Sequence, residues 1–486
     1  MNKLNFVAAI LSFLKVGIMG FGGGAALIPV IEDEVVQKKK WMTKDDFDYK
    51  VVVASISPGS LPVSFLSMWN HKYSIVSSFA YALPGPILFL ILQTGFALIG
   101  EAGVRYIGFA SVGIIAFILM VIYSFIKRNW LHDTKIIPMW QYCGIIVTAF
   151  FLTSGNSVRR LAVALFGLRA GVLPAPVFAI AMLQLLIILF FIVFFVGQSK
   201  SLIKLSTSVV ISLFFAISAG RSELLSNWNT WLIILMLVLA AGSVSYDAML
   251  SKDKNMVSAK KFDLIAIRNF VLFGLIGIVL TFAVFAISGD SRTFGFAIRV
   301  ILSSWQSFGG GEVYINIADA VFVQGGFVSE EIYYSQIVGV SSAMPGPVLM
   351  AIAGGIGFWF GNSIGGYFLA WIFGLLAVFL AVVASALGTL ALFTGFGLFK
   401  DSYRLKMIVR YMIPVICGVL INVALTLLNQ TSAVIINQYV NPWMAVGIVI
   451  GIFLVMLFLR TRYKVSDIKL LLGGGVGTLL VFGLVF

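Results

Sequence analysis

The sequence predicts an all-α polytopic membrane protein made of two related halves, with inverted topology and broken or re-entrant helices. Hydrophobic residues make up 60% of the 486-residue chain and charged residues 11%, whereas a soluble chain carries about a quarter charged residues. Mean hydropathy is +1.05. Continuous apolar runs of bilayer-spanning length recur along the chain, which favours helices over the alternating pattern of a barrel. A glycine-rich motif also occurs twice.

The two copies of this motif define the predicted halves. The first triglycine, 22–24, directly follows Phe21. The second, 309–311, directly follows Phe308, which lies 287 residues after Phe21 (308 − 21). Each copy is followed by a Pro-Gly pair, at Pro58 and at Pro345. Consecutive glycines weaken a helix by about 1 kcal/mol each relative to alanine, and freed backbone groups at bilayer depth need polar partners. A repeated interruption therefore predicts a binding site, as in carriers with broken helices. The alternative is that the glycines only allow close helix packing.

Three helix interruptions are expected in the first half. The apolar segment 4–31 contains Lys15 and has basic residues at both ends, which favours a hairpin with the glycines at its tip; a single span is the alternative. Thr43 is the expected N-cap of the next helix, with two aspartates in the first turn. Prolines then predict a break at 57–60 and a kink at 84–86.

The remaining apolar runs fix the domain organisation. We expect a first half at 1–250 with its motif at 13–60, a basic linker at 251–268, and a second half at 269–486 with its motif at 299–347. Glycines at 357, 361 and 365 predict close helix packing. Further spans are expected at 104–126, 137–154, 161–197 (divided by Pro174 and Pro176), 202–219, 229–250, 266–289, 366–398, 411–430, 433–459 and 470–486.

The net charge of +14 reflects membrane orientation rather than nucleic-acid binding, because the basic residues cluster between apolar runs. The segment 38–50 after the first motif holds five lysines, whereas 324–331 after the second holds none. This difference predicts oppositely oriented copies. Cys143 and Cys417 lie in separate apolar runs and are expected to be packed thiols, so the sequence predicts no disulfide, metal site or cofactor. The N-terminal segment is expected to belong to the mature protein.

The motif residues resemble the chromate transporter family. The resemblance lies in the two motif regions at 13–60 and 299–347, which make up about a fifth of the chain. It implies a two-half carrier in the plasma membrane. It also implies that the carrier exports chromate, an oxyanion like sulfate, and that the proton gradient drives the export. The matching blocks are 13–17, 21–24, 28–32, 34–36 and 41–43 in the first copy, and 308–311, 326–329 and 345–347 in the second.

A dianion inside a membrane must be met by hydrogen-bond donors or positive potential. Broken helices supply free backbone N–H groups and about half a positive charge at each N-terminus. Lys15 either supplies a counter-charge or extends to the interface. The predicted substrate-binding residues are Lys15, Phe21, Gly22, Gly23, Gly24, Pro58, Gly59, Ser60, Phe308, Gly309, Gly310, Gly311, Pro345, Gly346 and Pro347.

Glu312 and Asp319 are seven residues apart, so a continuous helix would place them on one face, where they are candidates for proton coupling. The alternative for Glu312 is a structural pair with Arg299. Gating or structural roles are expected for Glu32, Glu34 and Trp41.

The sequence therefore predicts a proton-coupled secondary carrier that works by alternating access and is not an enzyme. The partners expected are an oxyanion and membrane lipid, and glycine-rich faces allow a homodimer. The alternatives are an anion channel with the same site, a carrier for a different anion, or a membrane-embedded enzyme or scaffold. The chain has no Walker-type nucleotide motif and no clustered catalytic side chains, which disfavours ATP-driven transport and the enzyme alternative.

Overall fold

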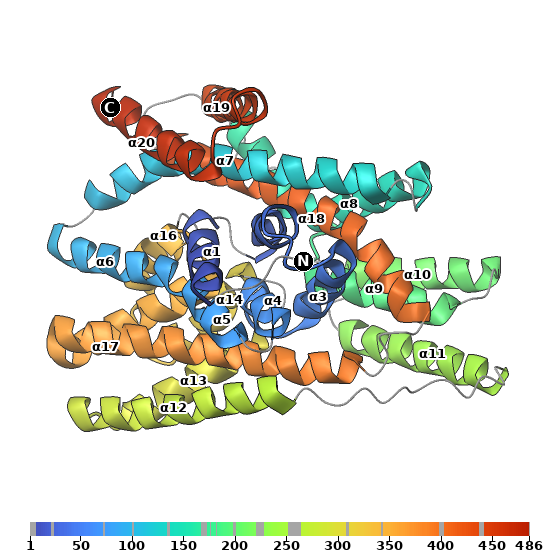
Figure 1. Cartoon of the computed structure of the whole chain (residues 1–486), viewed down its shortest axis with the longest axis horizontal. Coiled ribbons are helices and arrows are strands. Elements are labelled where there is room, and N and C mark those ends of the chain that lie inside the picture. Colours follow the sequence, from blue (N-terminus) through green and yellow to red (C-terminus); the bar gives the residue numbers. More distant parts are fainter. Residues whose placement is uncertain are drawn as a thin grey trace. The chain divides into compact units, whose positions relative to one another are not determined.

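The computed structural model confirms an all-α membrane protein with interrupted helices (Figure 1). The described residues contain no strand, and seven segments among them are long and apolar enough to cross a membrane. These residues are 6–20, 24–70, 73–99, 102–133, 137–166, 173–174, 176–180, 182–197, 201–219, 228–250, 264–307, 311–341, 344–397, 403–436 and 442–485.

The helices of the first half mirror the predicted motif order. A 3₁₀ turn and a π-helical turn flank the short helix after the first triglycine. The elements are α1 (Phe6–Met19), η1 (Gly24–Leu27), α2 (Ile28–Glu32), the π-helical η2 (Asp33–Lys38), α3 (Lys44–Ile56), α4 (Leu61–Trp69), α5 (Ser74–Ala82), α6 (Pro84–Ile99), α7 (Ala102–Asp133), α8 (Met139–Phe166), α9 (Met182–Val196), α10 (Leu202–Ala219) and α11 (Asn229–Leu250).

The second half repeats the order with different lengths. Its elements are α12 (Leu264–Ser288), α13 (Arg292–Gln306), α14 (Gly311–Ala318), the π-helical η4 (Asp319–Val323), α15 (Glu330–Ile332), the π-helical η5 (Tyr333–Val338), α16 (Gly339–Ser341), α17 (Val348–Gly397), α18 (Tyr403–Ile436), α19 (Pro442–Arg462) and α20 (Asp467–Val485). The predicted linker lies outside the described residues at 251–263, and its last five residues belong to α12.

Contacts divide the chain into two compact units. Unit 1 holds residues 1–124, 262–394 and 430–486, and unit 2 holds 125–261 and 395–429. Each unit takes segments from both predicted halves, and both copies of the glycine motif belong to unit 1. The boundary predicted at 251–268 stays a prediction.

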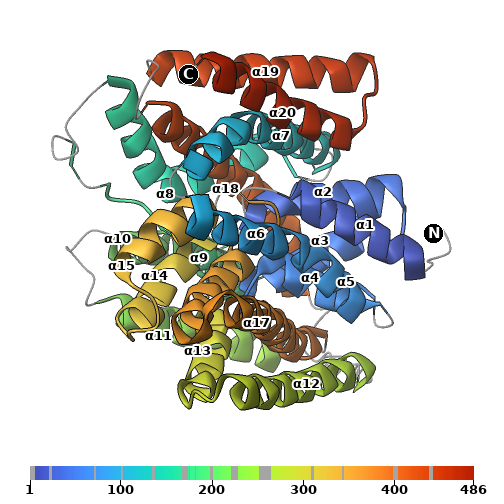
Figure 2. The same cartoon turned by 90° about the vertical axis from the view of Figure 1, so that its left-hand side faces the viewer.

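The chain folds back at the first glycine motif. Lys15 in α1 and Glu34 in η2 form an ion pair at 3.2 Å. A continuous helix would separate these residues by about 28 Å at 1.5 Å per residue. Figure 2 accordingly places α1 and α2 side by side. The hairpin interpretation of 4–31 therefore agrees with the structure and the single span does not. The second copy behaves in the same way, because the rings of Phe296 and Phe322 lie 5.8 Å apart.

Polar caps and prolines delimit the next helix in each half. Thr43 caps α3 as predicted, its Oγ1 accepting a hydrogen bond from the Asp46 N–H at 3.3 Å. In the second half the Ser329 hydroxyl accepts in the same way from Ile332. The stretch from the cap to the proline is one residue longer here, between Ser329 and Pro345, than between Thr43 and Pro58. The π-helical turn η5 accommodates such an extra residue.

Glycines let the two parts of α17 pack closely. Non-helical torsions at Gly365 and Gly366 divide it into helices 348–364 and 367–397. A methyl group on Gly357 would overlap the carbonyl oxygen of Phe373, and one on Gly361 would overlap that of Leu369. The predicted packing role is confirmed for these two glycines, whereas Gly365 lies at the kink itself.

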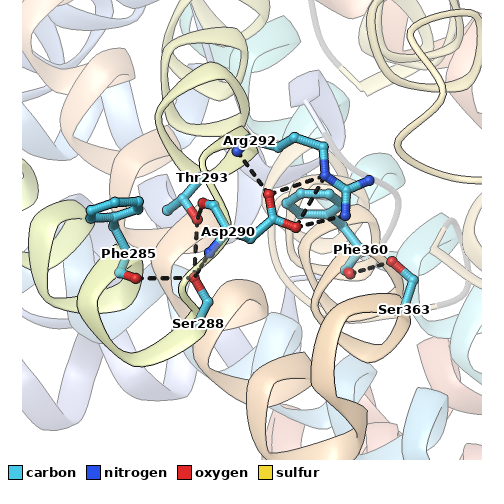
Figure 3. Close-up of polar contacts among 7 residues, drawn as sticks. All are labelled: Phe285, Ser288, Asp290, Arg292, Thr293, Phe360 and Ser363. Carbon is cyan, nitrogen blue, oxygen red and sulfur yellow. Dashed lines mark hydrogen bonds and ion pairs between the residues drawn. The ribbon is translucent and has the colours of Figure 1, made fainter.

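A polar cluster fixes the start of α13 (Figure 3). Asp290 accepts from the Arg292 backbone N–H at 2.8 Å and pairs with the Arg292 guanidinium at 2.6 Å. These hydrogen bonds hold the pKa of Asp290 below its usual range. The guanidinium also lies 5.3 Å from the ring centre of Phe360 in α17. The beginning of α13 is thereby held against α17.

In unit 2, α8 packs on α18 through hydrogen bonds. The Ser157 and Thr426 hydroxyls lie 2.9 Å apart, and the Asn429 amide donates to the Ser157 carbonyl at 2.8 Å. The runs expected at 137–154 and 161–197 are not separated at 155–160, because α8 continues through these residues to Phe166. Partners on α18 form hydrogen bonds with Ser157, one of the polar residues of this stretch. The division near Pro174 is confirmed, since the described residues at 173–180 are not helical.

Candidate substrate site

Two reciprocal hydrogen bonds connect the helix breaks of the two halves. The Gly59 N–H donates to the Ser307 carbonyl at 2.8 Å, and the Gly346 N–H donates to the Gly20 carbonyl at 2.5 Å. Gly20 and Ser307 are the last described residues before their triglycines, and each lies 287 positions from its counterpart, as do Gly59 and Gly346. Each Pro-Gly turn is therefore bonded to the end of the helix that precedes the other half's triglycine. We call this arrangement the crossing.

The local sequence explains why these turns reach across. Gly59 has φ of 97° and Gly346 has φ of 82°, a left-handed conformation that glycine adopts without a steric penalty. The proline before each glycine fixes its own φ and ends the preceding helix. The turn at Gly59 is further held by Ser385 of α17, whose hydroxyl accepts from the Ser60 N–H at 3.2 Å.

Backbones meet at the crossing without intervening side chains. A methyl group on Gly85 would overlap the Pro345 carbonyl oxygen, and one on Gly17 would overlap the Tyr81 carbonyl oxygen. The Cα of Gly85 is 3.6 Å from where a methyl group on Gly346 would lie. The kink predicted at 84–86 is present, between α5 and α6, and its glycine provides this contact.

Helix N-termini begin directly after the turns. α4 starts at Leu61, with Pro62 in its first turn, and α17 starts at Val348. First-turn amides have no intrahelical acceptors, and the helix dipole places positive potential there. The Ser64 hydroxyl of α4 is fully buried and has no hydrogen-bond partner among the described residues. These groups can donate hydrogen bonds to an anion.

The structure assembles part of the predicted substrate-binding set. Pro58, Gly59, Ser60, Pro345 and Gly346 lie at the crossing. Pro347 follows directly, and Gly24 and Gly311 begin η1 and α14. Substrate contact stays a prediction for all of them. Outside the described residues are Phe21, Gly22, Gly23, Phe308, Gly309 and Gly310.

Lys15 pairs with the side chain of Glu34, which is 5% exposed, while its own side chain is 31% exposed. Neither the counter-charge nor the interfacial interpretation included this partner, because Glu34 lies beyond the apolar segment 4–31 that contains Lys15. Glu32 is buried, 3.3 Å from the Lys44 ammonium. Trp41 packs against Phe13 and Trp69, with ring centres 6.2 and 5.5 Å away. Gating roles for Glu32, Glu34 and Trp41 stay predictions.

A four-residue charge network connects η2 to the turn between α19 and α20. Lys38 pairs with Asp33 at 2.6 Å and with Asp467, and Arg460 lies 3.3 Å from Asp467 and 3.6 Å from Asp33. This network was not predicted from the sequence. Its only signal was a single acidic residue, Asp467, among four basic residues in the gap between two apolar runs at 460–469.

On the second half, Asp319 begins η4 and accepts from the Gln324 amide at 3.3 Å. Glu312 belongs to α14, and its side chain lies outside the described part of the structure. An open cavity of about 340 Å³ lies between α13 and η4. Its lining residues are Arg299, Leu302, Ser303, Gln306, Ala320, Val321, Gln324 and Gly325. Proton coupling by Glu312 and Asp319 stays a prediction.

Comparison with known proteins gives matches to both halves. A family model described as "Chromate transporter" matches residues 7–172 and 294–479. The chain is 33% identical over 78 residues to "Uncharacterized transporter YwrB" of Bacillus subtilis, covering 15% of this chain and 40% of that protein. It is 30% identical over 94 residues (18% and 24%) to "Probable chromate transport protein" of Synechococcus elongatus. It is 28% identical over 100 residues (20% and 24%) to "Chromate transport protein" of Cupriavidus metallidurans. The matched part of the chain thus covers less than half of the length of each of these relatives.

Proposed function

Because the chain belongs to the chromate transporter family, we propose that it is a secondary carrier exporting chromate or a related tetrahedral oxyanion across the plasma membrane. The observation that carries this proposal is the reciprocal bonding of the two Pro-Gly turns to Gly20 and Ser307. These two hydrogen bonds connect four helix breaks within unit 1: the two Pro-Gly turns and the two helix ends that precede the triglycines. A site of this kind supplies backbone amides from both halves to one anion.

The chemistry of the crossing suits an oxyanion. Backbone N–H groups and the positive ends of α4 and α17 stabilise negative charge without a fixed cation, so the anion is not trapped. Lys15 is already paired with Glu34. In our proposal the amides around the triglycines bind the substrate, and Lys15 pairs with Glu34 instead of contacting the anion.

The repeated halves support alternating access. If the halves are inverted in the membrane, as the lysine distribution suggests, rocking one against the other would expose the crossing to each side in turn. The two hairpins also differ, since an ion pair joins the arms of the first, whereas a cavity lies between the arms of the second. Such a difference is expected when the two access routes are not open together.

The test is uptake into proteoliposomes of chromate, sulfate, molybdate and an organic anion, each with and without a pH gradient. We expect uptake of the tetrahedral oxyanions to accelerate when protons can move in the opposite direction to the substrate. Reversal potentials separate a carrier from the channel alternative, because a channel passes anions without stoichiometric proton movement. Absence of oxyanion movement under every gradient would refute the proposal.

Proton coupling through Glu312 gives a specific prediction. In Glu312→Gln we expect oxyanion transport to lose most of its dependence on the pH gradient, because the substituted side chain carries no titratable proton. Initial uptake rates between pH 6 and pH 8 provide the measurement. Glu330→Gln is the matched control, since Glu330 is an exposed carboxylate of the same half. An unchanged pH profile in Glu312→Gln would exclude this residue as the coupling group.

A further inference from the structure

The cavity between α13 and η4 corresponds in sequence to a place in the first half that an ion pair bridges. Leu302 and Val321 line the cavity, and each lies 287 positions after Lys15 and Glu34. In the first half these two positions face each other across the hairpin and form the 3.2 Å ion pair. In the second half the residues at these positions are apolar and have shorter side chains, and a cavity lies between α13 and η4.

One wall of the cavity carries an arginine. Arg299 is exposed and belongs to α13; its Nη1 donates to the Gly295 carbonyl at 3.2 Å, and its guanidinium lies 5.0 Å from the ring centre of Phe327. Stacking on a ring orients a guanidinium and leaves its planar edge for a bidentate acceptor. Chromate and sulfate offer paired oxygens of this kind.

One polar residue of the cavity is adjacent in sequence to the crossing. Gln306 lines it and directly precedes Ser307, whose carbonyl accepts the Gly59 N–H. Gln324 lines the opposite wall, with its amide on Asp319. Among the lining residues, Arg299 on α13 is the one with a positive charge.

We propose that this cavity is the vestibule through which a tetrahedral oxyanion reaches the crossing from one side of the membrane, and that Arg299 captures the anion there. The inference rests on the proposed function and adds the access route and its recognition residue. The volume accommodates an oxyanion with part of its hydration shell. The ion pair of Lys15 and Glu34 closes the corresponding route in the first half.

The first experiment measures sulfate and chromate uptake by Arg299→Ala in proteoliposomes at low and high ionic strength. Because capture acts before the rate-limiting step, we expect about a tenfold higher KM with little change in kcat, and a weaker salt dependence than wild type. In Arg299→Lys we expect a KM between those of wild type and Arg299→Ala. The matched control is Arg292→Ala, an arginine on the same helix that pairs with Asp290 outside the cavity. A KM and salt dependence equal to wild type would overturn capture by Arg299.

The second experiment builds the first-half ion pair into the second half. In Leu302→Lys with Val321→Glu we expect uptake below a tenth of wild type at every substrate concentration, because the new pair closes the cavity. Leu302→Lys alone should keep most of the uptake, since it adds a cation without a partner across the cavity. Full uptake by the folded double variant, judged by its gel-filtration profile, would overturn the vestibule. Failure of wild type to move any oxyanion would instead refute the proposed function.

Discussion

Gly85→Ala is expected to abolish both stable folding and transport. The added methyl group would overlap the carbonyl oxygen of Pro345, and a backbone atom cannot rotate away as a side chain can. Relief requires the turn at Gly346 to move, which breaks its hydrogen bond to Gly20. We expect a loss of at least about 4 kcal/mol, the range of severe backbone and packing defects. The measurement is the yield of monodisperse protein in detergent together with oxyanion uptake.

Gly95→Ala is the matched control for this substitution. Gly95 lies in the same helix, α6, and a methyl group there would meet no atom within 4 Å. Alanine is about 1 kcal/mol better than glycine inside a helix, so this variant should be as stable as wild type or slightly more so. Normal yield and uptake by Gly85→Ala would show that α6 does not contact the Pro345 turn as described.

Local signals in the sequence predicted the interruptions but not their partners. Proline and glycine at 57–60 and 84–86 dictate where helices end, and the Thr43 cap follows from side-chain chemistry within three residues. The bond between Gly59 and Ser307 joins residues far apart in the chain. Nothing in either local sequence specifies that pairing, although the predicted substrate-binding set combines residues of both copies.

Charged pairs formed by folding back were missed for a related reason. Lys15 was interpreted alone because its segment contains no acid, and its partner Glu34 comes after the triglycine. Lys38 and Asp467 meet although most of the chain separates them. The gap at 155–160 between two expected spans is helical for the opposite reason, because Ser157 in this polar stretch forms hydrogen bonds with α18.

Lys15→Leu is the second substitution with a large expected effect. It leaves the buried Glu34 carboxylate without its cation. Removing one member of a buried pair costs about 3–5 kcal/mol, and because a third of the Lys15 side chain is exposed we expect roughly 2–3 kcal/mol here. Thermal unfolding of the purified protein measures the loss. Glu34→Val should be milder, because the lysine it leaves unpaired is better placed to extend into solvent.

The double variant Lys15→Leu with Glu34→Val should recover most of that stability, because it removes both charges. It also gives positions 15 and 34 the leucine and valine that the second half has at 302 and 321. The difference between the double and the summed single effects should be at least about 1 kcal/mol, as expected for residues in contact. Recovered stability with altered transport would mean that the pair controls access through the first half rather than folding. Additive losses in the double variant would mean that the two side chains do not interact, and the closed route assigned to the first half would then lose its basis.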